Sequence, residues 1–162
     1  MTIQIGEAIP DATVSTPTED GPRPISAAEI FGGKTVALFA VPGAFTPTCS
    51  ARHLPGYVDN KEALKAKGVD TIACISVNDA FVMGAWAKAN ELNGQDDVLM
   101  LADGNGDLTR QLGLVLNATG FGMGERSQRY SMLVKDGVVT QLNIEQGGEF
   151  KVSAAEHLLA QI

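Results

Sequence analysis

The chain has few cysteines, few positive charges and no long hydrophobic run. Its 162 residues contain two cysteines, Cys49 and Cys74, which are too few for a disulfide-stabilised scaffold. The chain has 12 Lys and Arg against 19 Asp and Glu, a net charge of −7, and the basic residues do not cluster. Nucleic acid is therefore not an expected partner. No apolar run approaches the ~20 residues that span a bilayer, so no membrane partner is expected either.

Three further absences narrow the possible functions. The opening sequence MTIQIGEAIP has no basic segment followed by an apolar one, which indicates a cytoplasmic protein, although an organellar origin with the presequence removed stays open. His and Cys residues show no metal-ligand spacing. The glycines of Gly120–Gly124 neither follow a strand nor open a helix, as a dinucleotide motif requires. We expect no metal and no organic cofactor.

Hydrophobic residues make up 44% of the chain and charged residues 19%, which is ordinary for a globular protein. With no repeat, low-complexity tract or linker, residues 1–162 are expected to form a single domain. Predicted strands alternate with predicted helices, followed by a hairpin and a last helix, which indicates an α/β fold with a central mixed sheet and helices on both faces. Strands are expected at Val36–Val41, Thr71–Val77, Val98–Leu101, Ser131–Val134 and Val138–Leu142, after an irregular or hairpin-like entry over residues 1–24.

Capping residues and breakers set the predicted helix ends. Ser26 with Glu29 and Ser153 with Glu156 have the spacing of capping boxes, and Asp79 is expected to cap the helix Ala80–Leu92. A longer helix is expected from just after Pro47 to about Lys67, kinked at Pro55 and ended by Gly68. The last helix should end near Gln161.

Cys49 lies in the segment PGAFTPTC, where a predicted buried strand ends, a Pro-Gly turn follows and a helix opens. Unpaired N–H groups and partial positive charge at a helix N-terminus stabilise a thiolate. Ligand sites of parallel sheets lie beyond the carboxyl ends of the strands, which is where this cysteine is expected. The sequence therefore predicts a reactive thiol at Cys49.

PGAFTPTC resembles the Pro-x-x-x-Thr-x-x-Cys signature of the peroxiredoxins. The wider AVPGAFTPTCSARHLPGY, together with ACISVNDAFVMGAW, LADGNGDLTRQLGL and RSQRYSMLVKDGVV, resembles their type II branch, which includes the mammalian peroxiredoxin-five-like proteins. The resemblance covers nearly the whole chain. It implies a thioredoxin-like fold and a thiol-dependent peroxidase that reduces hydrogen peroxide and alkyl hydroperoxides through a Cys49 sulfenic acid, with Pro42, Thr46 and Arg129 completing the site.

A thiolate alone does not make a fast peroxidase. A thiol whose pKa falls from ~8.5 to ~6 gains about 30-fold in thiolate at pH 7, but its intrinsic nucleophilicity falls about tenfold. The site must therefore also stabilise the breaking O–O bond with hydrogen-bond donors. Thr46, three residues before Cys49, and the Arg129 guanidinium are the candidate donors, and Pro42 would shield the sulfur from water.

Arg126 and Arg129 both lie in the segment that resembles the family. The family pattern places the catalytic arginine immediately before the aromatic residue, here Tyr130, so Arg129 is the prediction. His53, one turn after Cys49, suggests a thiol-protease pair, but no orienting Asp or Asn accompanies it. We expect a structural or supporting role for His53.

Cys74 is the only other thiol that could resolve a Cys49 sulfenic acid. It lies three residues before Val77, ~10 Å from the sheet edge where Cys49 is expected, and Cα atoms more than ~7 Å apart cannot be bridged without backbone movement. Cys74 is therefore predicted to be a core thiol, with a resolving role as the lesser alternative. The lack of a further cysteine in residues 147–162 and of a fused glutaredoxin domain indicates an external reductant, glutathione with glutaredoxin first and thioredoxin second.

The resemblance also implies a homodimer. Phe45, Phe81, Met83 and Trp86 are candidates either for the core or for an apolar patch beside the site. The alternative function is a non-peroxidatic redox sensor or chaperone-like binding module, which would not need both Thr46 and Arg129. A dithiol oxidoreductase would need Cys-x-x-Cys, and the fourth position here is Arg52.

Overall fold

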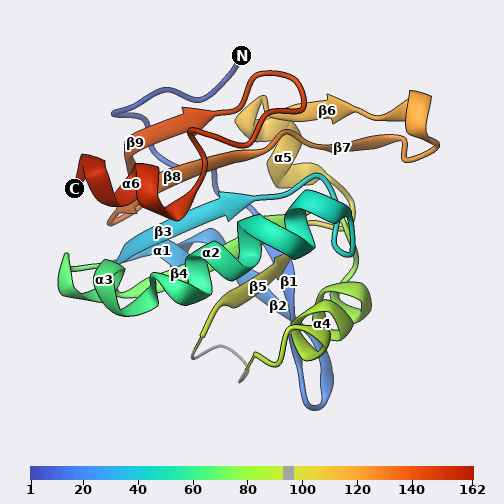
Figure 1. Ribbon diagram of the computed structural model, residues 1–162, viewed down its shortest axis with the longest axis horizontal. Helices are drawn as coiled ribbons and strands as arrows, with labels where there is room; N and C mark the ends of the chain where they lie inside the picture. Colours follow the sequence, from blue (N-terminus) through green and yellow to red (C-terminus); the bar gives the residue numbers. More distant parts are fainter. Residues whose placement is uncertain (93–96) are drawn as a thin grey trace.

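A mixed β-sheet forms the centre of the structure, a computed structural model that describes residues 1–92 and 97–162 (Figure 1). The strands of the described residues are β1 (Thr13–Thr18), β2 (Gly21–Ser26), β3 (Thr35–Ala40), β4 (Thr71–Ser76), β5 (Leu99–Ala102), β6 (Val115–Asn117), β7 (Glu125–Ser127), β8 (Tyr130–Lys135) and β9 (Val138–Ile144). The helices are α1 (Ala27–Phe31), η1 (Cys49–His53, a π-helical turn), α2 (Leu54–Asp59), α3 (Lys61–Ala66), α4 (Ala80–Ala89), α5 (Asp107–Leu112), η3 (Thr119–Phe121, a 3₁₀ turn) and α6 (Ala155–Gln161).

In the described part of the chain, the main sheet has seven strands in the order β2-β1-β5-β4-β3-β8-β9. Strands β3, β4 and β5 are parallel, and the strands beyond them on either side pair antiparallel. β4 is the central strand because it carries the continuous apolar run TIACIS, which suits burial on both faces. The predicted mixed sheet and the predicted central strand are confirmed.

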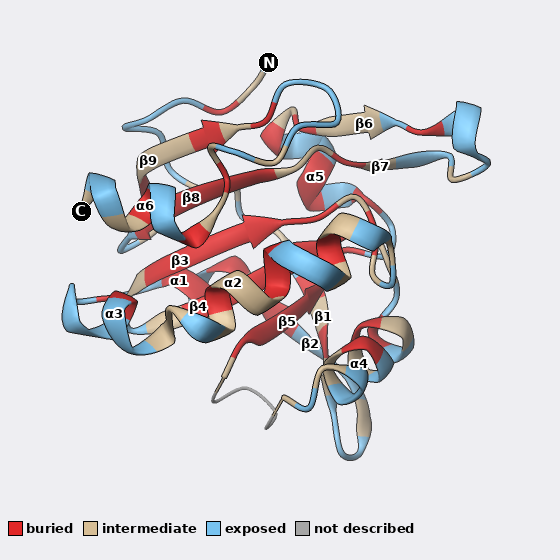
Figure 2. Cartoon of the chain, in the orientation of Figure 1, coloured by how far each residue is buried: buried red, intermediate tan, exposed pale blue. Residues whose placement is uncertain are grey.

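Two apolar clusters lie on opposite faces of this sheet. Along β3, Leu38 belongs to the cluster that includes residues of α1 and α5, whereas Phe39 belongs to the cluster under α2, α3, α4 and α6. Successive side chains of a strand point to opposite faces, so an all-apolar strand supplies both clusters. Figure 2 shows the strands buried between helices whose outer surfaces are exposed. Cys49 and Cys74 both belong to the second cluster, on one face of the sheet.

The helix after β3 differs from the prediction. The expected single helix is divided into η1, α2 and α3, with a break at Asn60, and its irregularity begins before Pro55. The N–H of Leu54 donates to the carbonyl of Cys49, an i→i−5 bond that widens the turn. Proline lacks an N–H and its ring clashes with the carbonyl four residues earlier, so a wider turn just before Pro55 suits the proline. Gly68, with φ +95°, follows the end of α3 as predicted.

Most of the predicted local signals are confirmed. Ser26 and Glu29 form a capping box, Asp79 caps α4 by accepting from the N–H of Val82, and Asp136-Gly137 turns the β8–β9 hairpin with both φ values positive. The second capping box is wrong. Ser153 donates its hydroxyl to Glu145 instead, and α6 begins after Ala154 with no side-chain cap.

None of the helices among the described residues is both long and apolar enough to cross a bilayer.

Candidate active site

The turn between β3 and η1 is held by one hydrogen bond within it and one to the segment after β4. The Thr46 hydroxyl donates to the carbonyl of Gly43 at 2.7 Å, and the N–H of Ala44 donates to Asn78 Oδ1 at 3.0 Å. Gly43 is tightly packed, because an added Cβ would lie 3.2 Å from Thr46 Cγ2 and 3.3 Å from Met123 Cε, so these neighbours would have to shift slightly. The half-buried Pro42 opens this turn, directly after the last residue of the buried run. The turn thus delivers Cys49 to the carboxyl end of β3.

Cys49 begins η1 and has no solvent-exposed surface. Arg129 Nη2 donates to its Sγ at 3.1 Å. Since a guanidinium is always charged in proteins and only donates, the sulfur is the acceptor in this contact. The fully buried thiol therefore meets the fixed positive charge of a partly buried arginine.

Arg129 lies between β7 and β8 and is held from two sides. Its Nη1 is 2.8 Å from His53 Nδ1, and its Cζ lies 5.9 Å from the centre of the Phe150 ring. Arg126 is engaged elsewhere, donating to the carbonyls of Met123 and Val77. Of the two arginines that the sequence left as candidates, Arg129 is the one that contacts the sulfur.

His53 is fully buried behind Arg129. Its Nε2 lies 3.1 Å from the carbonyl of Ser153, and its ring packs against those of Phe39, Tyr57 and Phe150. Burial, and then the charge of Arg129, lower the pKa of His53 to about 3. A neutral ring that accepts from Arg129 cannot act as the charged partner of a thiol-protease pair, which agrees with the expected supporting role.

The hydroxyl of Thr46 does not have the predicted role of hydrogen-bond donor to the peroxide. Its hydroxyl proton is committed to the Gly43 carbonyl, so the oxygen offers lone pairs to any further partner. Thr46 is thus equipped to accept a hydrogen bond, which leaves Arg129 as the donor among the predicted site residues. The sequence shows that a hydroxyl is present but not which neighbouring carbonyl takes its proton.

Cys74 is buried in the middle of β4, where it pairs in register with Phe39. Burial raises the pKa of its thiol well above the ordinary value. Both cysteines are free. The structure therefore places Cys74 as a core residue on the same face as Cys49, with its thiolate disfavoured.

Supporting contacts of three residues were not foreseen from the sequence. Asn78 accepts from both Ala44 and the Ser76 hydroxyl, Trp86 Nε1 donates to Ser50 Oγ at 3.0 Å, and Glu145 binds Ser153. Asn78 could have been suspected, because it follows the strand next to β3 and so lies at the same sheet edge. Met83 and Trp86 are core residues, whereas Phe45 and Phe81 are exposed.

A buried thiol that accepts a hydrogen bond from a guanidinium at the end of a parallel strand is the arrangement expected of a cysteine-dependent peroxidase, and comparisons with known proteins agree with it. The Redoxin family model matches residues 4–159. The chain is 51% identical to the chloroplastic peroxiredoxin-2E-2 of Oryza sativa subsp. japonica, covering 98% of this chain and 72% of that protein, and 48% identical to peroxiredoxin-2B of Arabidopsis thaliana, covering 97% and 96%.

Solved structures agree with these relatives. Reduced Prx3 of Vibrio vulnificus in complex with H₂O₂ is 52% identical, covers 99% of each chain and has a TM-score of 0.93. The chain therefore belongs to the Redoxin family and, within it, to the type II peroxiredoxins of thioredoxin fold, and it is a thiol-dependent peroxidase.

Proposed function

We propose that Cys49 is the peroxidatic nucleophile for hydrogen peroxide and small alkyl hydroperoxides. The observation that carries this role is the 3.1 Å contact between Arg129 Nη2 and Cys49 Sγ in a site without exposed thiol surface. The sulfur attacks one peroxide oxygen, the O–O bond breaks, and the sulfur keeps that oxygen as a sulfenic acid. The other oxygen leaves with the electron pair and takes up a proton, which gives water or an alcohol.

Arg129 and Thr46 supply complementary hydrogen bonds in this proposal. The guanidinium donates to the oxygens on which negative charge develops, and burial of the Cys49 sulfur makes this stabilisation stronger than in open water. The Thr46 oxygen accepts the hydrogen bond of the peroxide O–H, since its own proton is bound to Gly43. Pro42 keeps water from the sulfur. This arrangement supplies the stabilisation that a thiolate alone lacks.

The test of this role is peroxide consumption with excess dithiothreitol by the wild type, Cys49→Ser and Cys74→Ser. We expect turnover to vanish in Cys49→Ser and to persist in Cys74→Ser. Equal rates of the wild type and Cys49→Ser would end the proposal.

An external thiol is proposed to recycle the sulfenic acid. It condenses with the Cys49 sulfenic acid to a mixed disulfide and water, and a second thiol then restores Cys49. Burial of Cys74 within β4 supports this route, because an internal bridge would need backbone movement. Non-reducing mass spectrometry after one equivalent of peroxide should show no rapid Cys49–Cys74 disulfide; dominant loss of both thiols within one chain would contradict it.

Glutathione with glutaredoxin is the first proposed reductant and thioredoxin the second. Reconstituted assays with each system, at equal enzyme and peroxide concentrations, decide between them by the rate of NADPH consumption. The cytoplasmic location stays a prediction of the sequence that cell fractionation would test.

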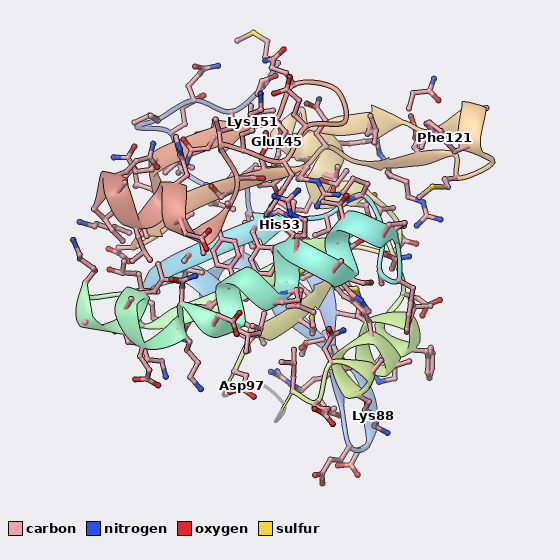
Figure 3. All side chains as sticks on the ribbon, viewed as in Figure 1. His53, Lys88, Asp97, Phe121, Glu145 and Lys151 are labelled. Carbon is pink, nitrogen blue, oxygen red and sulfur yellow. The ribbon has the colours of Figure 1, made fainter. Side chains whose placement is uncertain are left out.

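A homodimer is proposed from exposed aromatic side chains. Phe45 is 55% exposed in the turn before Cys49, and Phe81 and Phe121 are 73% and 86% exposed. Figure 3 shows Phe121 at the far end of the β6–β7 hairpin, away from the main sheet. Large apolar side chains exposed in this way are enriched at protein interfaces.

A further inference from the structure

The segment between β9 and α6 is tied down by one buried carboxylate. Glu145 is 6% exposed, and its Oε2 accepts from the N–H of Lys151 at 2.7 Å, and from the N–H and hydroxyl of Ser153 at 2.8 and 2.5 Å. Burial alone would raise the pKa of Glu145, but the hydrogen bonds from Ser153 and Lys151 outweigh it and lower the pKa. The carboxylate is therefore charged, and its Oε2 holds residues 145–153 folded back on themselves.

This fold aims the Ser153 carbonyl at the active site. The carbonyl accepts from the Tyr57 hydroxyl at 2.9 Å and lies 3.1 Å from His53 Nε2. Because a carbonyl only accepts, the neutral His53 ring must carry its proton on Nε2, which leaves a lone pair on Nδ1. A guanidinium only donates, so the 2.8 Å contact of Arg129 Nη1 requires the same tautomer.

Glu145 also contacts Arg129 directly, through a main-chain hydrogen bond. Its N–H donates to the Arg129 carbonyl at 3.0 Å, so one residue holds both the main chain of the arginine and the segment that orients its side chain. The segment further carries Phe150, whose ring lies 5.0 Å from that of His53. Figure 3 shows His53 between the η1–α2 helix and the segment that carries Glu145 and Lys151.

We propose that Glu145 is a positioning residue for peroxide reduction. It fixes the position of the Ser153 carbonyl, and that carbonyl fixes the tautomer of His53. His53 in turn holds the Arg129 guanidinium against Cys49. The proposal rests on the roles proposed above for Cys49 and Arg129. Glu145 contacts no reacting atom. Its effect reaches the chemistry because a donor displaced by ~1 Å can cost about 100-fold in rate.

Glu145→Ala tests the proposal, with Glu149→Ala as the matched control. Glu149 is an exposed carboxylate in the same segment, so its loss removes the same charge without touching Ser153. We expect Glu145→Ala to lower the second-order rate constant of Cys49 with hydrogen peroxide by about 10- to 100-fold. Glu145→Gln, which keeps one acceptor oxygen, should lose less, and Glu149→Ala should stay within twofold of the wild type.

Alkylation of Cys49 by iodoacetamide separates positioning from a general loss of structure. Alkylation breaks no O–O bond, so its rate should fall far less than that of peroxide in Glu145→Ala. Equal loss in both reactions, or a folded Glu145→Ala with peroxide kinetics within twofold of the wild type, would overturn the proposal. Peroxide consumption by Cys49→Ser would instead overturn the proposed function, so the two failures are distinguishable.

The tautomer of His53 is measurable in the wild type by ¹H–¹⁵N correlation of the histidine side chains, with His157→Gln to assign the signals. We expect Nε2–H with an unprotonated Nδ1, and partial loss of this state in Glu145→Gln. An Nδ1–H tautomer in the wild type would refute the chain of contacts even if Glu145→Ala does not fold.

Discussion

At the scale of single residues, the site depends on one guanidinium that makes two contacts. Arg129 uses Nη1 for His53 and Nη2 for Cys49. A lysine offers a single ammonium on a flexible chain and cannot reproduce this fork. The geometry explains why position 129 needs an arginine, and it separates Arg129 from Arg126, which binds main-chain carbonyls.

We expect Arg129→Ala to lower the peroxide rate constant by about 30- to 1,000-fold, which corresponds to ~2–4 kcal/mol of transition-state stabilisation. Arg129→Lys should recover only part of this loss. Stopped-flow kinetics of the reduced enzyme measure the effect. A loss of less than threefold in Arg129→Ala would show that another group stabilises the leaving oxygen.

His53 gives the stability a pH dependence. Its pKa is 6.5 when unfolded and about 3 when folded, so between these values the unfolded chain binds a proton that the folded protein does not. The contribution of His53 to the free energy of unfolding is therefore fully present above pH 6.5 and falls by about 1.4 kcal/mol per pH unit as the pH drops toward 3. Urea unfolding between about pH 7 and 5 should show this slope in the wild type and lose it in His53→Gln. An unchanged slope would exclude His53 as its source.

At the scale of elements, the turn before Cys49 is fixed by the ends of neighbouring elements. Asn78, which follows β4, holds Ala44, and Trp86 in α4 holds Ser50 beside the nucleophile. The carboxyl ends of parallel strands meet at one sheet edge, so residues far apart in sequence support one short turn.

Removing the Asn78 acceptor should displace this turn. Asn78→Ala leaves the Ala44 N–H without its partner, which costs about 1–3 kcal/mol of stability, and it should also lower the peroxide rate constant. Asn78→Asp keeps an acceptor and should retain most of the activity. The stability and activity of both variants are measured by thermal unfolding and peroxide kinetics, with the wild type for comparison. Identical behaviour of the two variants would contradict a role for the Ala44–Asn78 hydrogen bond.

The single tryptophan reports on Cys49. Trp86 donates to the hydroxyl of the residue that follows Cys49, so conversion of the sulfur to a sulfenic acid should change its fluorescence. A rapid change on mixing with peroxide, absent in Cys49→Ser, is expected in stopped-flow traces. A signal of equal size in Cys49→Ser would show that Trp86 responds to peroxide directly.

At the scale of the whole molecule, the exposed aromatic residues lead to a test of assembly. We expect sedimentation equilibrium to give a dimer whose dissociation constant rises at least tenfold in Phe45→Ser or Phe81→Ser, since each change removes exposed apolar area. Val138→Ser, which changes a 37% exposed residue of β9, is the control. A monomer at all concentrations would contradict the proposed homodimer.

Much of the fold could be predicted from local patterns. The all-apolar runs of β3 and β4 predict buried strands, and Asp136-Gly137 predicts the hairpin, because turn chemistry and side-chain alternation act over a few residues. The second capping box failed for the opposite reason. Ser153 and Glu156 have the right spacing, but Glu145, which lies outside the capping pattern at the end of the preceding strand, takes the Ser153 hydroxyl.

The sequence by itself determined the family, the order of the elements and the position of Cys49 where a helix opens, because motif spacing and hydrophobic periodicity are properties of short segments. The family pattern had also selected Arg129 over Arg126, and the structure confirms that Arg129 contacts the sulfur. Only the tertiary structure decided that Thr46 has an oxygen free to accept a hydrogen bond and that His53 lies behind the arginine. These contacts depend on which segments of the chain pack against η1. Hydrogen bonds require partners within about 3 Å, and no local pattern specifies partners that lie many residues away.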